Sequence, residues 1–75
     1  MNETLVEIVA EIFDIEESDV TPESNPDSVN NWDSLNNLKL VTAVEEEFKI
    51  KLSMDEIETI LTIGQLDEVI KNKLG

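Results

Sequence analysis

The sequence predicts an all-α fold, a small four-helix bundle with three longer helices, one short helix and a long loop between the first and second. Apolar residues recur at helical spacing in separate segments, no segment shows strand alternation, and turn-forming residues gather in one stretch. With 75 residues and no internal repeat, residues 1–75 are expected to form one domain.

The first helix is expected over roughly Glu3 to Ile15. Acidic residues separate its apolar positions, and Asn2 is a suitable N-cap. The apolar stripe consists of Leu5, Ile8, Val9, Ile12 and Phe13. A long loop follows over residues 16–31, because prolines lie there among Ser, Asn, Asp and Thr. Its apolar residues, Val20 and Val29, are expected to anchor it to the core.

The second helix is expected over roughly Ser34 to Lys49, with Asp33 as its N-cap. Apolar residues again follow a helical stripe, consisting of Leu35, Leu38, Val41, Val44 and Phe48 with Leu40 and Ala43 beside it. The stretch "EEEF" ends the segment, with two lysines near the negative end of the helix dipole.

Two further helices follow. The stretch "SMDE", from Ser53 to Glu56, is a capping box that starts a short helix. Thr62 and Gln65 repeat this pattern and open a last helix that carries Leu66, Val69, Ile70 and Leu74. Gly64 lies early in that helix, where glycine is unfavourable.

The net charge of -13 predicts which partners the protein meets. Eighteen acids face five lysines, and no lysine precedes Lys39. Such a surface repels nucleic acid and anionic membranes and attracts basic protein surfaces, although acidity also serves solubility alone. The N-terminus carries acids where a signal peptide needs positive charge, and no apolar run reaches membrane-spanning length. We therefore expect a cytoplasmic protein without membrane insertion.

Composition also argues against an enzyme that acts through its own side chains. The chain has no histidine and no cysteine, so a serine has no imidazole base and no thiol is present. Neither acidic segment of the loop fits a calcium-binding pattern, and the only two glycines form no phosphate-binding loop. Acids on helical faces are mostly solvated surface. We expect no catalytic residue and no metal site.

The stretch "WDSLNNLKLVTAVEEEFKI" resembles the acyl carrier proteins and the related peptidyl carrier domains. Within it, Asp33, Ser34 and Leu35 match the attachment motif of that family, and the order and spacing of the other segments agree over essentially the whole chain. The resemblance implies an acyl-carrier-protein-like bundle with 4′-phosphopantetheine, donated by coenzyme A, attached to Ser34. A separate phosphopantetheinyl transferase places this arm, and acyl or aminoacyl groups travel on its thiol as thioesters.

The resemblance also implies that the second helix docks loading and transferring enzymes with basic patches, and that the carrier is a monomer. Leu35 is expected to contact partners, while Leu38 fits either contact or core. Glu45 and Glu46 suit pairing with a partner's Lys or Arg and equally suit solvated surface. The core positions of this helix are expected to be Leu40, Val41, Val44 and Phe48.

Four residues depart from the carriers of fatty acid synthesis. Lys39, Asn36 and Asn37 stand where acids are usual, and Trp32 replaces a small residue, either as a lid over the loop or as a partner contact. These departures favour a specialised, stand-alone carrier for polyketide or nonribosomal peptide assembly, or for a surface polysaccharide or lipid. The alternatives are an acidic helical module that binds a basic protein without a cofactor and, more remotely, a small acid/base enzyme.

Overall fold

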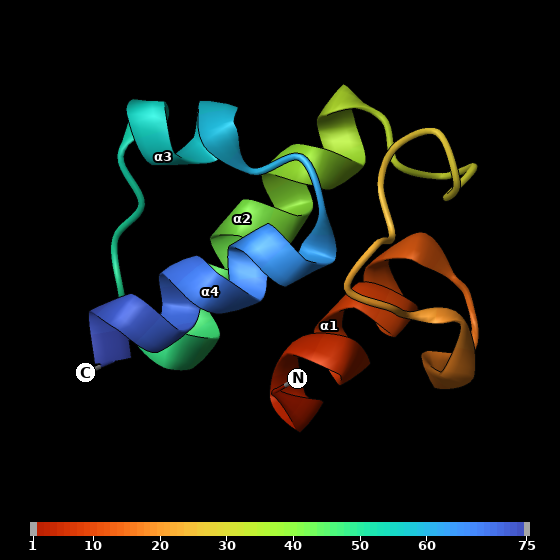
Figure 1. The fold of residues 1–75 in the computed structure, drawn as a ribbon, viewed down its shortest axis with the longest axis horizontal. Coiled ribbons are helices and arrows are strands. Elements are labelled where there is room, and N and C mark those ends of the chain that lie inside the picture. The colour runs from red at the N-terminus through yellow and green to blue at the C-terminus, as the bar shows by residue number, and fades with distance from the viewer. Residues whose placement is uncertain (1, 75) are drawn as a thin grey trace.

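The computed structural model describes residues 2–74, and within them it is all-helical (Figure 1). This confirms the predicted fold class, with three longer helices and one short one. The elements follow in the order α1 (Glu3–Phe13), the 3-10 turn η1 (Glu17–Asp19), α2 (Ser34–Phe48), α3 (Met54–Thr59) and α4 (Ile63–Leu74).

α1 begins where the sequence predicts and ends two residues earlier. The side-chain oxygen of Asn2 accepts hydrogen bonds from the N–H groups of Thr4 (2.8 Å) and Leu5 (3.2 Å) and so caps the helix. At the other end Asp14 adopts the left-handed conformation, with φ 55° and ψ 52°, and its N–H donates to the carbonyl oxygen of Ala10. That conformation turns the chain away from the helix axis.

α2 ends in the same manner, one residue before the expected boundary. Lys49 adopts φ 56° and ψ 48°, and its N–H donates to the carbonyl oxygen of Glu45. Ile50 donates to the same oxygen at 3.1 Å. Both boundaries therefore differ from the prediction because a residue other than glycine takes the left-handed position, which sequence pattern does not mark.

Both predicted caps of the C-terminal half are present. In the capping box of α3, the Ser53 hydroxyl accepts from the Glu56 N–H at 3.1 Å, and the Glu56 carboxylate accepts from the Ser53 N–H at 2.9 Å. Before α4, the Thr62 hydroxyl accepts from the Gln65 N–H at 3.2 Å, and the Gln65 side chain accepts from the Thr62 N–H at 3.0 Å.

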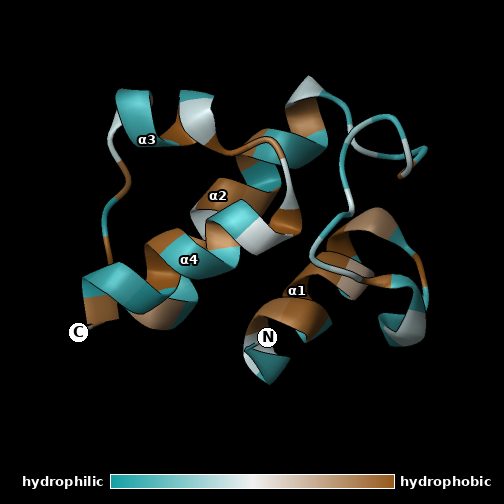
Figure 2. Cartoon of the chain, viewed as in Figure 1, coloured by the Kyte–Doolittle hydropathy of each residue, from teal (hydrophilic) through white to brown (hydrophobic). Residues whose placement is uncertain are grey.

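One hydrophobic core joins α1, α2 and α4, and Ile57 of α3 is partly buried against it. Val20 and Val29 are buried in this core, as predicted, so the long loop is pinned at two points. Apolar and polar residues form separate bands on the helices (Figure 2). The buried apolar residues are Leu5, Val9, Ala10, Phe13, Val20, Val29, Trp32, Leu40, Val41, Val44, Leu52, Ile63, Leu66 and Ile70.

The helices are short. α2 is the longest of those that the structure describes, with 15 residues. None of the helices within residues 2–74 has the length and apolar character needed to cross a membrane.

Candidate functional site

Ser34 is the first residue of α2, and its side chain is exposed. The preceding Asp33 is extended, with φ -109° and ψ -177°, and its carboxylate accepts the Asn36 N–H at 2.8 Å. Its carbonyl oxygen accepts the Asn37 N–H, also at 2.8 Å, and so begins the helix. Asp33 is therefore occupied as the N-cap, and the Ser34 hydroxyl has no hydrogen-bond partner among residues 2–74.

Two large apolar side chains accompany Ser34 on the open face of α2. Leu35 and Leu38 are each 62% exposed. Helical spacing places residues 34 and 38 on one face, with residue 35 beside them. The exposure expected for Leu35 is confirmed, and Leu38, which fitted either contact or core, also lies at the surface.

The inner face of α2 follows the prediction. Leu40, Val41 and Val44 are buried, and Phe48 is half-buried against the core. Glu45 is half-buried, and its carboxylate accepts the Leu52 N–H at 2.8 Å and so holds the turn after the helix.

Three charged residues of α2 stay at the surface, Lys39, Glu46 and Glu47. Lys39 has no ion-pair partner within residues 2–74. Near Ser34 the open face of α2 thus carries two leucines and one lysine. The acidic residues of this helix occur only further towards its C-terminal end.

Trp32 is only 8% exposed and lies two residues before Ser34. Its ring stacks on Phe13 at the end of α1, with centroids 5.2 Å apart and an interplanar angle of 27°. Its indole N–H donates to the side-chain oxygen of Asn37 at 3.0 Å. Of the two readings of this residue, the structure supports a lid packed between the loop and the helices.

Three asparagines surround the serine in a way that sequence reasoning missed. The side-chain amide of Asn31 donates to the carbonyl oxygen of Phe13 at 2.7 Å, and that of Asn36 donates to the carbonyl oxygen of Asn31 at 2.7 Å. Asn37 accepts from Trp32. The only signal in the sequence was the clustering of asparagines in "NNWDSLNNL". Asn36 and Asn37 therefore both have hydrogen-bond partners in the local structure.

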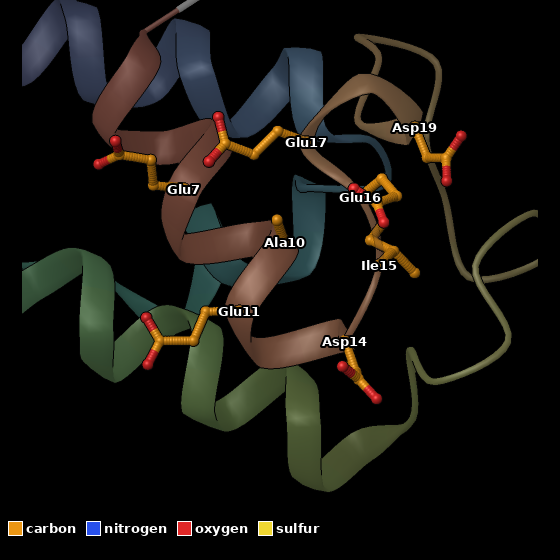
Figure 3. A pocket seen from close by; sticks show the side chains of 8 residues that line it. All are labelled: Glu7, Ala10, Glu11, Asp14, Ile15, Glu16, Glu17 and Asp19. Carbon is orange, nitrogen blue, oxygen red and sulfur yellow. The ribbon is translucent and has the colours of Figure 1, made fainter.

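An acidic hollow lies on α1 and η1 (Figure 3). Six carboxylates line it, from Glu7, Glu11, Asp14, Glu16, Glu17 and Asp19. Figure 3 shows these groups spread around the hollow rather than converging on one point. Within residues 2–74, no group of three or more acidic side chains is arranged to hold a metal ion. Ser34 is not among the lining residues, so the hollow is separate from the serine site.

Comparisons with known proteins agree over most of the chain. Residues 3–70 match a family model described as the phosphopantetheine attachment site. The chain is 40% identical over 68 residues to an acyl carrier protein of Picosynechococcus sp., covering 91% of this chain and 84% of that protein. Its fold resembles the solution NMR structure of the holo acyl carrier protein from Geobacter metallireducens, with a TM-score of 0.87 and 28% identity, covering 96% of this chain and 83% of that chain.

Proposed function

The chain belongs to the acyl carrier protein family, and from this premise we propose that Ser34 is the residue to which its 4′-phosphopantetheine arm is attached. The arm supplies a thiol on which acyl groups are carried as thioesters. The observation that carries the proposal is the placement of Ser34, whose exposed hydroxyl stands at the first residue of α2 beside the capping Asp33.

The backbone at this end of α2 suits a phosphodiester. The N–H groups of Ser34 and Leu35 have no acceptor among residues 2–74. Unpaired N–H groups at a helix start, together with the helix dipole, favour a nearby anion. The Asp33 carboxylate accepts the Asn36 N–H, so this side chain is held in the cap.

The other serines are less suited to attachment. Ser24 is 4% exposed, and its hydroxyl accepts from the Thr21 N–H. The Ser28 hydroxyl bonds to Asn25, and the Ser53 hydroxyl caps α3. Ser18 is exposed but lies in the three-residue turn η1, which offers no extended helix behind it. Ser34 alone combines exposure, an uncommitted hydroxyl and the start of a long helix.

The biological role extends from this site. We propose that residues 1–75 act as a single, monomeric, cytoplasmic carrier domain that contributes no catalytic group. Its partners are a phosphopantetheinyl transferase and acyl-loading or acyl-transferring enzymes with basic docking patches, in a specialised rather than a general fatty acid pathway. The exposed pair Leu35 and Leu38 beside Ser34 supports docking through α2. The family match favours this reading over an acidic module without a cofactor.

An intact mass spectrum after incubation with coenzyme A and a broad-specificity phosphopantetheinyl transferase tests the site. We expect one added phosphopantetheine on the parent protein and none on Ser34→Ala. Ser53→Ala is the matched control, because Ser53 is also an exposed serine at a helix start. It should be modified like the parent, and circular dichroism should show that all three proteins are folded. Modification of a folded Ser34→Ala protein would refute the assignment.

A further inference from the structure

We propose that Asn36, with Trp32 and Asn37, is a positioning residue for Ser34, because these side chains brace the start of α2 against the end of α1. The inference rests on the proposed attachment of the arm to Ser34 and concerns how the hydroxyl is presented to the transferase. We call the set of Asn31, Trp32, Asn36 and Asn37 the brace.

The direction in which Ser34 points depends on how the loop enters α2. Residues 31–33 make this entry, and their backbone bonds are local: Trp32 donates to Val29 at 3.1 Å, and Asp33 donates to Asn31 at 3.1 Å. Such turns fix the local shape of residues 31–33 but do not tie this entry to α1. That tie comes from side chains.

Two amide groups make the polar half of the brace. Asn31 donates to the carbonyl oxygen of Phe13, which lies in the last turn of α1 and has no partner within its own helix. Asn36 then donates from α2 back to the carbonyl oxygen of Asn31. The start of α2 is in this way linked to the end of α1 through two hydrogen bonds of 2.7 Å.

The aromatic half runs in parallel. Trp32 stacks on Phe13 and donates to Asn37, one turn into α2. Phe13 therefore contacts both halves of the brace. Its ring stacks on Trp32, and its carbonyl oxygen accepts the hydrogen bond from Asn31. Ser34 lies in the chain between the loop residues of the brace, Asn31 and Trp32, and its helix residues, Asn36 and Asn37. A change in either half therefore alters how the first turn of α2 presents the Ser34 hydroxyl.

The two asparagines of α2 differ in what their side chains must do, and this difference makes the inference testable. Asn36 acts as a donor, a role that a carboxylate cannot fill, whereas Asn37 acts as an acceptor, a role that a carboxylate fills well. Asn36→Asp and Asn37→Asp make the same charge change at adjacent, half-buried positions. Only the first breaks a hydrogen bond of the brace.

The experiment measures kcat and KM for phosphopantetheine transfer to the parent and to both variants, with the coenzyme A and transferase used above. We expect Asn36→Asp to lower kcat about three- to tenfold, the effect of losing one ordinary hydrogen bond, without raising KM, since Leu35 and Leu38 remain exposed. Asn37→Asp should keep the parent kcat. Equal kcat values for the two variants would overturn the brace, whatever those values are.

A second readout does not depend on the transferase. Trp32 is the only tryptophan of the chain, so acrylamide quenching of its fluorescence reports on the brace alone. Quenching should increase in Asn36→Asp and stay near the parent value in Asn37→Asp. If Asn36→Asp does not fold, Asn37→Leu takes its place, because leucine removes the acceptor that aspartate retains.

The outcomes separate this inference from the proposed function. A parent protein that is not modified would refute the attachment at Ser34 and the inference with it. A parent that is modified at Ser34, with both aspartate variants reacting and quenching alike, would refute the brace alone.

Discussion

A Cβ atom on Gly64 would lie 2.9 Å from the carbonyl oxygen of Pro22, so the start of α4 packs directly on the backbone of the long loop. The Gly64 N–H donates to that oxygen at 3.0 Å, and the neighbouring Ile63 N–H donates to the carbonyl oxygen of Ser24, also at 3.0 Å. These two bonds hold the loop on the bundle. Glycine is needed here for close approach, although it weakens a helix.

The first prediction is that Gly64→Ala destabilises the protein. Helix propensity alone favours alanine by about 1 kcal/mol, but the contact with the Pro22 backbone forces the loop to shift, and overpacking of this kind costs about 1–3 kcal/mol. After the gain in helix propensity is subtracted, we expect the free energy of unfolding in urea to fall by up to about 2 kcal/mol. Asn72→Ala, at an exposed position of the same helix, is the control and should be neutral or slightly stabilising. A Gly64→Ala protein as stable as the parent would show that the loop moves freely.

The second prediction concerns Lys49, which holds the left-handed position after α2. A side chain in that conformation costs about 1 kcal/mol, and glycine avoids the cost. Lys49→Gly should therefore raise the free energy of unfolding by up to about 1 kcal/mol, measured in urea. Lys51→Gly makes the same substitution two residues later, where φ is not positive, and should not stabilise. If both substitutions changed the stability equally, the gain would come from the lost charge or from a change in the unfolded chain rather than from the left-handed conformation.

The third prediction concerns how the stability of the fold depends on pH. The pKa of Glu56 lies below its ordinary value of 4.5, mainly because the Ser53 N–H donates to its carboxylate and secondarily because of Lys73. Lys73 Nζ lies 3.0 Å from Glu56 Oε1. A lowered folded-state pKa stabilises the fold above the unfolded-state pKa, and this stabilisation disappears as pH falls through the folded-state value.

Glu56→Gln tests this, because glutamine keeps the capping box but does not titrate. We expect the difference in melting temperature between parent and variant to be largest near neutral pH and to shrink as pH falls below about 4.5. Comparing the two proteins cancels the relief of repulsion among the other acids. A difference that stays constant over this range would mean that the lowered pKa contributes nothing to folding.

Much of the fold could be read from local sequence, because the signals that set it are local. Asn2, Ser53 and Thr62 each cap a helix that lies within a few residues. The ends of α1 and α2 were misplaced because Asp14 and Lys49, rather than glycine, take the left-handed position. The reason for Gly64 depends on a loop more than forty residues earlier in the chain, which no local pattern reveals.

The candidate site divides in the same way. Asp33, Ser34 and Leu35 form a contiguous motif, so their placement at the start of α2 could be predicted. Trp32 and Asn31 both contact Phe13, which lies eighteen or more residues earlier in the chain. An asparagine that braces a loop has the same appearance in a sequence as one on a solvated surface, and only the fold distinguishes them.

The fourth prediction concerns Lys39, which is exposed on α2 one turn after Leu35. If partners dock through basic patches, Lys39→Glu should lower KM for a broad-specificity phosphopantetheinyl transferase and raise kcat/KM about two- to fivefold at low salt, and this gain should fade as salt screens exposed charges. Lys71→Glu makes the same charge change on exposed α4 and should do less; equal gains would mean that net charge alone acts. A loss specific to Lys39→Glu would contradict the prediction and would indicate an acidic group of the transferase opposite this lysine.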